Sequence, residues 1–83
     1  MAMGRHRQEI DSYLEAIRLD SSYAKAHFNL AMAHDILKNG EAAISHARRA
    51  EVLYGKKRKH RQERTVRRYL NILNEKYGLF THE

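Results

Sequence analysis

Residues 22–54 read SYAKAHFNLAMAHDILKNGEAAISHARRAEVLY, and this stretch decides the fold class. Its apolar residues recur three or four positions apart, in one set before Gly40 and another after it. The two sets are Ala26, Leu30, Ala33 and Leu37, and then Ile44, Ala47, Ala50 and Leu53. Residues at this spacing share one face of a helix, so the stretch predicts two amphipathic helices joined by a short turn.

The same spacing continues on both sides of this stretch. The flanking stripes are Ile10, Tyr13, Leu14 and Ile17 upstream, and Val66, Leu70, Leu73 and Tyr77 downstream. No window alternates with period two over the length of a strand, which argues against a sheet. The sequence therefore predicts an all-α chain, with helices at about 7–19, 23–38, 41–54 and 58–77.

The ends of these helices are marked by the few residues that favour turns and caps. Proline is absent, and glycine occurs only at positions 4, 40, 55 and 78, each of which is expected at a helix end or turn. Asp20, Ser21 and Ser22 are expected to cap the second helix with their side-chain oxygens. Because the connections are short, successive helices are expected to run antiparallel as hairpins.

The chain also matches itself after a shift of 34 residues, which places Ile10 on Ile44, Ala16 on Ala50 and Leu19 on Leu53. A fixed period of this size indicates stacked supersecondary units rather than one globular core. The segments YLEAIRLD at 13–20, AHFNLA at 26–31 and GEAAI at 40–44 resemble the tetratricopeptide repeat (TPR) family, whose unit is a helix–turn–helix of this length.

This resemblance implies a TPR-like α-solenoid of antiparallel helical hairpins, about one and a half repeats long with a C-terminal capping helix. The repeat region would span residues 4–54, as a half repeat at 4–20 and a full repeat at 22–54. A basic capping helix and tail would follow at 55–83. The alanines at 31, 43 and 50 fit positions where the family prefers small side chains, because helices approach closely only there.

By the same resemblance, six residues of the second helix are expected to line a groove that binds a peptide or a helix. They are Lys25, Phe28, Asn29, Met32, Asp35 and Ile36. Phe28, Met32 and Ile36 lie four apart and form an apolar strip separate from the core stripe, which suits an apolar side of a partner. The alternative is that neighbouring helices of the same chain cover this strip.

The first helix is expected to mediate self-association. Its stripe consists of Ile10, Tyr13, Leu14 and Ile17, and the helix that would cover part of it in a repeat array lies outside the chain. Burying side chains of this kind contributes about 1.5–3 kcal/mol each, so a symmetric homodimer is expected to cover the stripe. Two alternatives stay open: the fourth helix folds back over the stripe, or the chain is a fragment of a longer array.

The net charge of +6 lies entirely in the last third of the chain. Residues 1–54 carry seven basic and seven acidic residues, whereas residues 55–83 carry nine basic and three acidic ones. The basic run consists of Lys56, Lys57, Arg58, Lys59, Arg61, Arg64, Arg67 and Arg68. Such a run binds nucleic acid or another anionic surface without sequence specificity, and it also resembles a nuclear-localisation signal. The plainer alternative is a solvated face of a capping helix.

Composition excludes several classes of site. Cysteine is absent, which removes disulfides and thiolate metal sites. No apolar stretch approaches the ~20 residues of a membrane span, so a soluble intracellular protein of the cytoplasm is expected.

Six histidines occur, at positions 6, 27, 34, 46, 60 and 82. His27, His34 and His46 can approach one another, but their spacing is not typical of a metal site, and neither a metal nor a cofactor is expected.

No nucleophile motif or phosphate-binding glycine loop is present in the sequence, so enzyme activity is not expected. The sequence predicts a non-enzymatic module for protein interaction and assembly, which binds a peptide or helix and associates with itself. The alternative is a nucleic-acid-binding accessory protein that uses residues 56–68.

Overall fold

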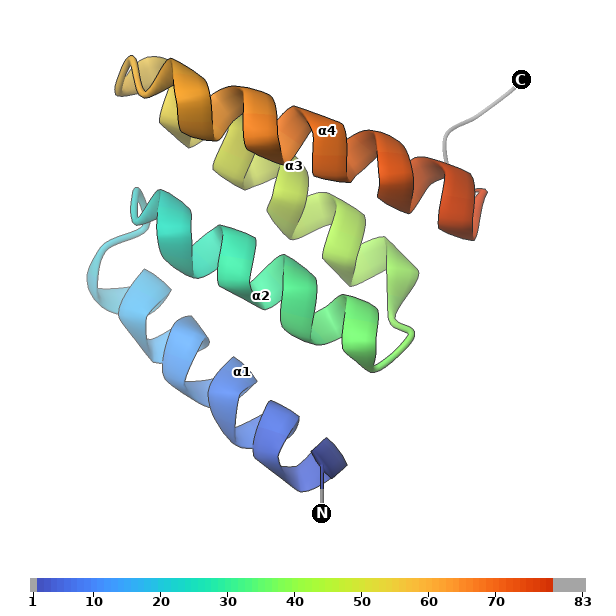
Figure 1. Ribbon diagram of the computed structural model, residues 1–83. Coiled ribbons are helices and arrows are strands. Elements are labelled where there is room, and N and C mark those ends of the chain that lie inside the picture. The colour runs from blue at the N-terminus through green and yellow to red at the C-terminus, as the bar shows by residue number, and fades with distance from the viewer. Residues whose placement is uncertain (1, 79–83) are drawn as a thin grey trace.

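Four α-helices make up the described part of the chain. The computed structural model describes residues 2–78. Helix α1 spans Ala2–Leu19, α2 spans Ala24–Ile36, α3 spans Gly40–Lys56 and α4 spans His60–Tyr77 (Figure 1). No strand occurs among residues 2–78. The prediction of a small all-α chain with four helices is therefore confirmed.

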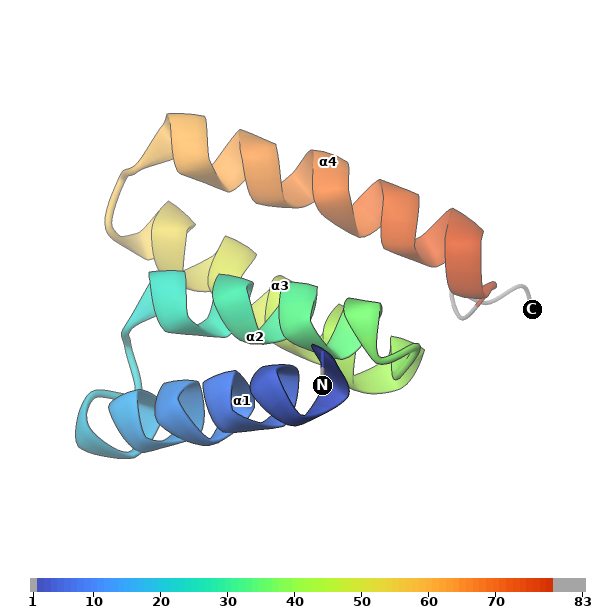
Figure 2. The same ribbon diagram turned by 60° about the horizontal axis from the view of Figure 1, so that its bottom comes forward.

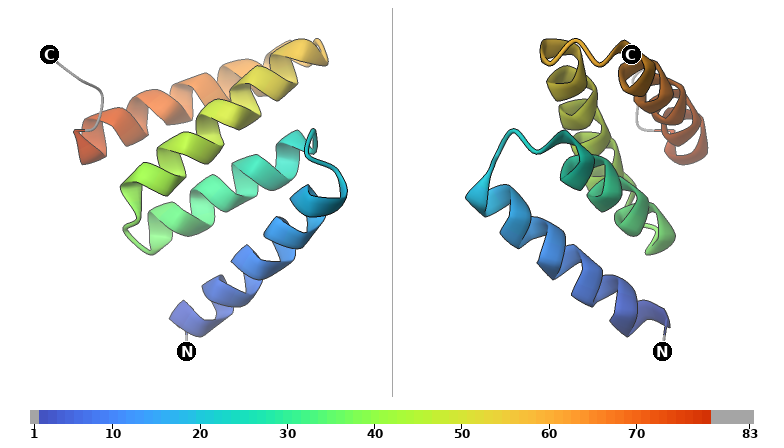
Figure 3. Two further views of the ribbon diagram at one scale, coloured as in Figure 1. Left: turned by 180° about the vertical axis from the view of Figure 1, so that it is seen from behind. Right: turned by 60° about the vertical axis from the view of Figure 1, so that its left-hand side comes forward.

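Each helix reverses the direction of the one before it and packs against it. Helix α1 packs on α2, α2 on α3, and α3 on α4. As a result α2 and α4 run in the same direction (Figure 1), and α1 and α4 lie at opposite ends of the row (Figures 2 and 3). The helical hairpins are thus present, whereas the solenoid is not established by four helices. Residues 79–83 of the predicted tail lie outside the described residues.

The core lies between α2, α3 and α4 and depends on small residues where α2 meets α3. Ala31, Ala43 and Ala50 have no exposed surface, which lets the two backbones approach closely. Larger side chains fill the remaining space, namely Ile44, Leu53, Tyr54, Val66, Leu70 and Leu73. Burial of a leucine such as Leu73 contributes about 1.5–3 kcal/mol, so α4 is part of the fold rather than an appended tail.

The two turns on either side of α3 have the same geometry, 20 residues apart. Lys38 and Arg58 adopt left-handed backbone conformations, with φ of 64° and 59°. The next residue in each turn donates its amide to a carbonyl five positions back: Asn39 to His34 at 2.8 Å and Lys59 to Tyr54 at 2.9 Å. These hydrogen bonds close each helix in the manner of a Schellman motif, with a basic residue where glycine is usual.

The glycines serve different purposes from those expected. Gly78 has φ of 61° and ends α4, as the sequence predicted. Gly4 lies inside α1 rather than between two helices, whereas Gly55 is the penultimate residue of α3 and so lies at a helix end. Gly40 is the first residue of α3 and lies against the ring of Tyr77, where an added Cβ would stand 2.5 Å from the ring carbons. Close packing therefore requires glycine at position 40.

The predicted cap of α2 is also corrected by the structure. Oδ1 of Asp20 accepts hydrogen bonds from the amide and hydroxyl groups of Ser22, at 3.0 and 2.7 Å. This closes a local turn, and the N-cap of α2 is Tyr23, which makes no side-chain cap. Helix α2 ends at Ile36 rather than at residue 38 because Lys38 leaves the helical conformation. None of the helices in the described range is long and apolar enough to cross a bilayer.

Candidate functional site

Helix α2 carries apolar residues on every side, including the side that the other helices leave open. Its sides facing α1 and α3 bury Ala24, Ala26, His27, Leu30, Ala31 and Ala33. The open side carries Lys25, Asn29, Met32 and Ile36. Met32 is 37% exposed and Ile36 is 56% exposed. Helices that are apolar all round are normally buried, so this open side is an unusual surface.

Helix α4 extends this surface beside α2. The rings of Phe28 and Tyr69 meet edge to face, with centroids 5.6 Å apart. Ile72 is 54% exposed and lies on α4 between Tyr69 and Lys76, which both contact Asp35 of α2. Since residues three and four apart share a helix face, Ile72 is on the side of α4 that faces α2. We call the surface formed by Phe28, Met32, Ile36, Tyr69 and Ile72 the α2–α4 face.

A small cavity opens at the end of this face where α2 and α4 begin. Its volume is about 120 Å³, and its walls come from both helices and the end of α3. The lining residues are Phe28, Tyr54, Arg61, Gln62, Thr65 and Val66. A shallower hollow of about 290 Å³ adjoins it at Tyr54 and Gln62 and is lined by three lysines, Lys25, Lys57 and Lys59. This end of the α2–α4 face is therefore basic around a partly apolar cavity.

Asp35 fixes α4 to α2 at the other end of the face. Its carboxylate accepts hydrogen bonds from Tyr77 at 2.6 Å, Lys76 at 2.9 Å and Tyr69 at 3.1 Å. Burial raises the pKa of Asp35, but these three hydrogen bonds outweigh it, and the net pKa is below the usual value. Burial and then the Asp35 carboxylate raise the pKa of Tyr77 to about 12.

The six residues predicted to line a peptide groove are thus divided by the structure. Lys25, Asn29, Met32 and Ile36 share the open side of α2. Phe28 is partly covered by Tyr69, and Asp35 is occupied by donors from α4. Of the apolar strip, Phe28 fits the alternative interpretation in part, because Tyr69 of a neighbouring helix packs against it. Asp35 was not part of that strip. The contacts of Asp35 join residues 34–42 positions apart, and no sequence pattern marked them.

The basic run does not form one continuous surface. Lys56 ends α3, Lys57, Arg58 and Lys59 form the turn, and the arginines follow on α4. Arg61, Arg64 and Arg68 are exposed, and within the described residues none of them lies within 4 Å of a carboxylate.

Arg67 points to a different side of α4. It forms ion pairs with Glu51 at 2.7 Å and Glu63 at 3.1 Å. These contacts, chiefly the one with Glu51, raise the pKa of Arg67. Glu51 and Glu63 are therefore paired with Arg67 rather than with Arg61, Arg64 or Arg68.

Three histidines meet where α2 packs on α3. Nδ1 of His27 lies 3.3 Å from Nδ1 of His46, and the rings of His34 and His46 stack with centroids 5.6 Å apart and an interplanar angle of 2°. Nε2 of His27 lies 3.3 Å from the carbonyl oxygen of Ser21, which can only accept, so this nitrogen carries the proton. Neutral His27 therefore accepts at Nδ1, and His46 donates.

Burial lowers the pKa of each of these histidines. For His46 the neighbouring His27 and His34 lower it further, and for His27 the charge of Arg49 does so. Within the described residues no group of three or more histidine or carboxylate side chains is arranged to hold a metal ion.

The stripe on α1 faces α2 for most of its length. Ile10, Tyr13 and Ile17 are partly buried, and Ile10 lies beside His34 and Leu37 of α2. Leu14 is 46% exposed. Helix α4 packs on α3 and does not fold back over α1. The argument for self-association is weaker than expected, because α2 partly buries three of the four residues. The dimer itself stays a prediction.

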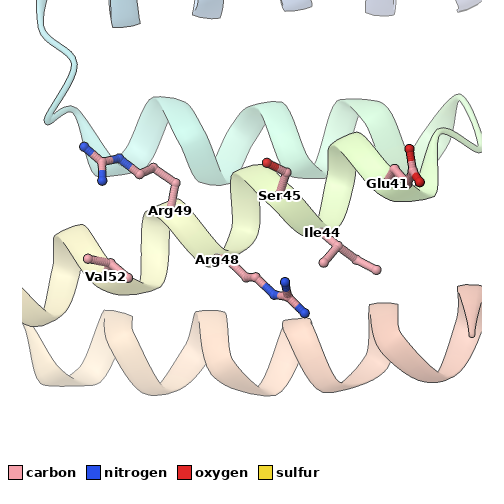
Figure 4. Close-up of a pocket in the computed structure, with 6 residues that line it drawn as sticks. All are labelled: Glu41, Ile44, Ser45, Arg48, Arg49 and Val52. Carbon is pink, nitrogen blue, oxygen red and sulfur yellow. The ribbon is translucent and has the colours of Figure 1, made fainter. Parts of the chain in front are cut away.

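A wider surface hollow lies on the outer side of α3 and is less suited to binding. Its volume is about 530 Å³, and it is lined by Glu41, Ile44, Ser45, Arg48, Arg49 and Val52. All six residues belong to one helix, and the side chains of Arg48 and Arg49 point in opposite directions (Figure 4). Because ligand sites enclose their ligand with converging groups, this hollow is a poorer candidate than the α2–α4 face.

The chain belongs to the family described as Domain of unknown function (DUF6340), whose sequence model matches residues 6–75. The predicted membership of the tetratricopeptide repeat family is wrong, since the match is to this different family and no tetratricopeptide family matches. No curated protein and no solved structure matches the chain significantly. The matched residues include all of α2 and α3 and nearly all of α4, and therefore every residue of the α2–α4 face.

Proposed function

We propose that this chain is a non-enzymatic module for protein interaction, and that it binds a peptide or helix of another protein on the α2–α4 face. One observation carries the proposal: Met32 and Ile36 are exposed side by side on the open side of α2, next to Lys25 and Asn29. Contiguous apolar surface of this kind, bordered by polar residues, is typical of protein-binding sites.

The polar groups near the face support a binding role over a catalytic one. Asp35, Tyr69, Tyr77 and Lys76 satisfy one another by hydrogen bonds and hold two helices in place. A catalytic carboxylate needs to reach a substrate, whereas this one is already bound to three donors within the chain. The network therefore acts as a rigid support for the apolar residues beside it.

Affinity capture from the source organism tests this proposal. The bait is the full chain, compared with the variant Met32→Glu/Ile36→Glu and with the control Leu19→Glu/Val52→Glu. The control places the same charges on two exposed apolar residues outside the face, which are 73% and 47% exposed. We expect a protein retained by the wild type and the control and lost by the face variant. Equal retention by all three would contradict the proposal.

Nucleic-acid binding through residues 56–68 is a second candidate function, favoured by Arg61, Arg64 and Arg68 of α4, which form no ion pair with any of residues 2–78. Such binding is electrostatic and weakens steeply with salt. Titration of a fluorescent oligonucleotide at about 50 mM and about 200 mM salt tests it. Salt-dependent binding that the variant Arg61→Glu/Arg64→Glu/Arg68→Glu abolishes would support this function. Absence of binding at the lower salt concentration would remove it.

A further inference from the structure

We infer that the partner of the α2–α4 face is an acidic amphipathic helix. This inference rests on the proposed function and adds the shape and charge of the partner. Its evidence is the parallel arrangement of α2 and α4, the cavity between them, and the distribution of charge around that cavity.

The shape of the face fits a helix. Met32 and Ile36 lie one turn apart on α2, which runs parallel to α4 (Figure 1). Ile72 lies on α4 between Tyr69 and Lys76, which both contact Asp35 of α2. A helix that lies along this strip presents apolar side chains three and four positions apart, at a matching spacing. Recognition by β-strand addition would need a sheet edge, and residues 2–78 contain no strand.

The cavity of about 120 Å³ provides a place for one anchoring side chain. Phe28 and Val66 form apolar walls on its two sides, and Arg61 and Gln62 provide polar groups. Interfaces concentrate their binding energy in a few side chains that fill such cavities. A leucine or methionine of the partner helix would therefore enter here, while the rest of its apolar seam covers Met32, Ile36 and Ile72.

The positive charge around the face favours a partner with acidic side chains. The adjoining hollow is lined by Lys25, Lys57 and Lys59 and by no acidic residue. Helices α2 and α4 both begin at this end of the face, so their positive dipole ends add to the lysine charges. Arg61 lies at the cavity. The acidic residues lie toward the other end of the face, where Asp35 already accepts hydrogen bonds from α4 and Glu75 is exposed three residues after Ile72. Acidic side chains beside the partner's apolar seam would complement this surface.

A displayed peptide library tests the inference. The peptides have about 18 residues, roughly 27 Å as a helix, and vary among apolar, glutamate, lysine and serine positions. The library is selected on the full wild-type chain, and the affinity of each enriched peptide is then measured for a set of variants. Lys25→Glu/Lys59→Glu/Arg61→Glu reverses the charge of the face, and Arg48→Glu/Arg49→Glu/Lys56→Glu makes the same change in net charge on α3.

We expect the enriched peptides to be acidic, with apolar residues three and four apart. Charge reversal on the face should weaken the binding of these peptides at least about tenfold, which equals about 1.4 kcal/mol. The α3 control should weaken their binding less than about twofold. Neutral or basic peptides that still require Met32 and Ile36 would overturn the acidic partner and leave the proposed function intact. Failure to enrich any peptide that depends on Met32 and Ile36 would overturn both.

Two further results would assign the face to a different occupant. Tighter binding of an oligonucleotide than of any selected peptide, lost with the same charge reversal, would overturn the inference in favour of nucleic acid. A dimer in sedimentation equilibrium that Met32→Glu/Ile36→Glu converts to monomer would overturn it in favour of a second copy of this chain.

Discussion

The hydroxyl group of Tyr77 donates a hydrogen bond of 2.6 Å to Oδ1 of Asp35, although the two residues lie 42 positions apart in the sequence. The same hydroxyl lies 3.1 Å from the backbone carbonyl of Asp35. This contact joins the last turn of α2 to the last turn of α4, and Tyr69 and Lys76 reinforce it. The α2–α4 face therefore has two rigid sides whose separation is set within the chain.

Removal of the Asp35 carboxylate should destabilise the fold. Asp35→Ala removes the carboxylate that accepts from Tyr69 and Tyr77 and leaves Tyr77 only the backbone carbonyl of residue 35 as an acceptor. A loss of this kind costs about 1–3 kcal/mol. Urea denaturation measures the change, with the exposed Asp11→Ala as the control. A free energy of unfolding for Asp35→Ala equal to that of the control would show that the network does not hold α4 in place.

The stability should fall as the solution becomes mildly acidic because of the histidine cluster. The pKa values of His27, His34 and His46 are lowered in the folded chain, so the unfolded chain binds more protons. Stability is then highest above the unfolded pKa of about 6.5 and decreases as pH falls below it. The charge of Arg49 lowers the pKa of His27 further, and Arg7 and Lys38, which line a hollow together with His34, are also cations.

Thermal melting between about pH 7.5 and pH 5 checks this prediction. His46→Gln should have a shallower dependence on pH than the wild type, because its ring contacts both other histidines. The control His60→Gln alters an exposed histidine of α4. A slope that His46→Gln leaves unchanged would contradict the role of the cluster. The stability that ionised Asp35 contributes should be lost separately, below about pH 4, because its pKa is lowered in the folded chain.

Glycine at the two turn positions should stabilise the chain. Lys38 and Arg58 hold left-handed conformations, which cost roughly 1–2 kcal/mol for residues other than glycine. We expect Lys38→Gly and Arg58→Gly each to add about 0.5–1 kcal/mol after the flexibility of glycine is subtracted. Chemical denaturation compares them with Lys56→Gly in the last turn of α3, where glycine should destabilise. Destabilisation by both turn variants would contradict the left-handed assignment.

Two glycine-to-alanine substitutions in α3 should have opposite effects. A Cβ at position 40 would stand 2.5 Å from the ring of Tyr77, so Gly40→Ala must displace α4 and should destabilise by about 1–3 kcal/mol. At position 55 the nearest atom, at 3.0 Å, is a carboxylate oxygen of Glu63, which can move away. Gly55→Ala should therefore be neutral or stabilising, because alanine favours helix. Similar melting temperatures for the two variants would contradict this packing.

The apolar periodicity of the sequence was sufficient to predict the four helices. Stripes such as Val66, Leu70 and Leu73 reflect the side that each helix buries, so helix type and approximate bounds follow from local spacing. The turns were less predictable, because the left-handed positions carry Lys38 and Arg58 rather than glycine. The cap at Asp20 was misassigned because the same side chain can close a local turn or cap a helix.

Local sequence patterns could not identify the family of the chain or the structural role of Asp35. Buried alanines at 31, 43 and 50 are required wherever two helices pack closely, so they indicated the α2–α3 hairpin but not the family. Asp35 appeared to belong with Met32 and Ile36 on one helix side, yet α4 occupies its carboxylate. Only the folded arrangement brings these distant residues together, and it divides the predicted groove into a covered part and an open part.

The central claim is that the α2–α4 face binds a partner, and methyl NMR of the full chain with the captured partner tests it most directly. Signals are compared for Met32, Ile36 and Ile72 on the face and for Leu14, Leu19 and Val52, which are exposed elsewhere. We predict that the partner shifts or broadens the first three signals and leaves the last three unchanged. Perturbation of Leu14, Leu19 or Val52 with no change at Met32, Ile36 and Ile72 would contradict the claim.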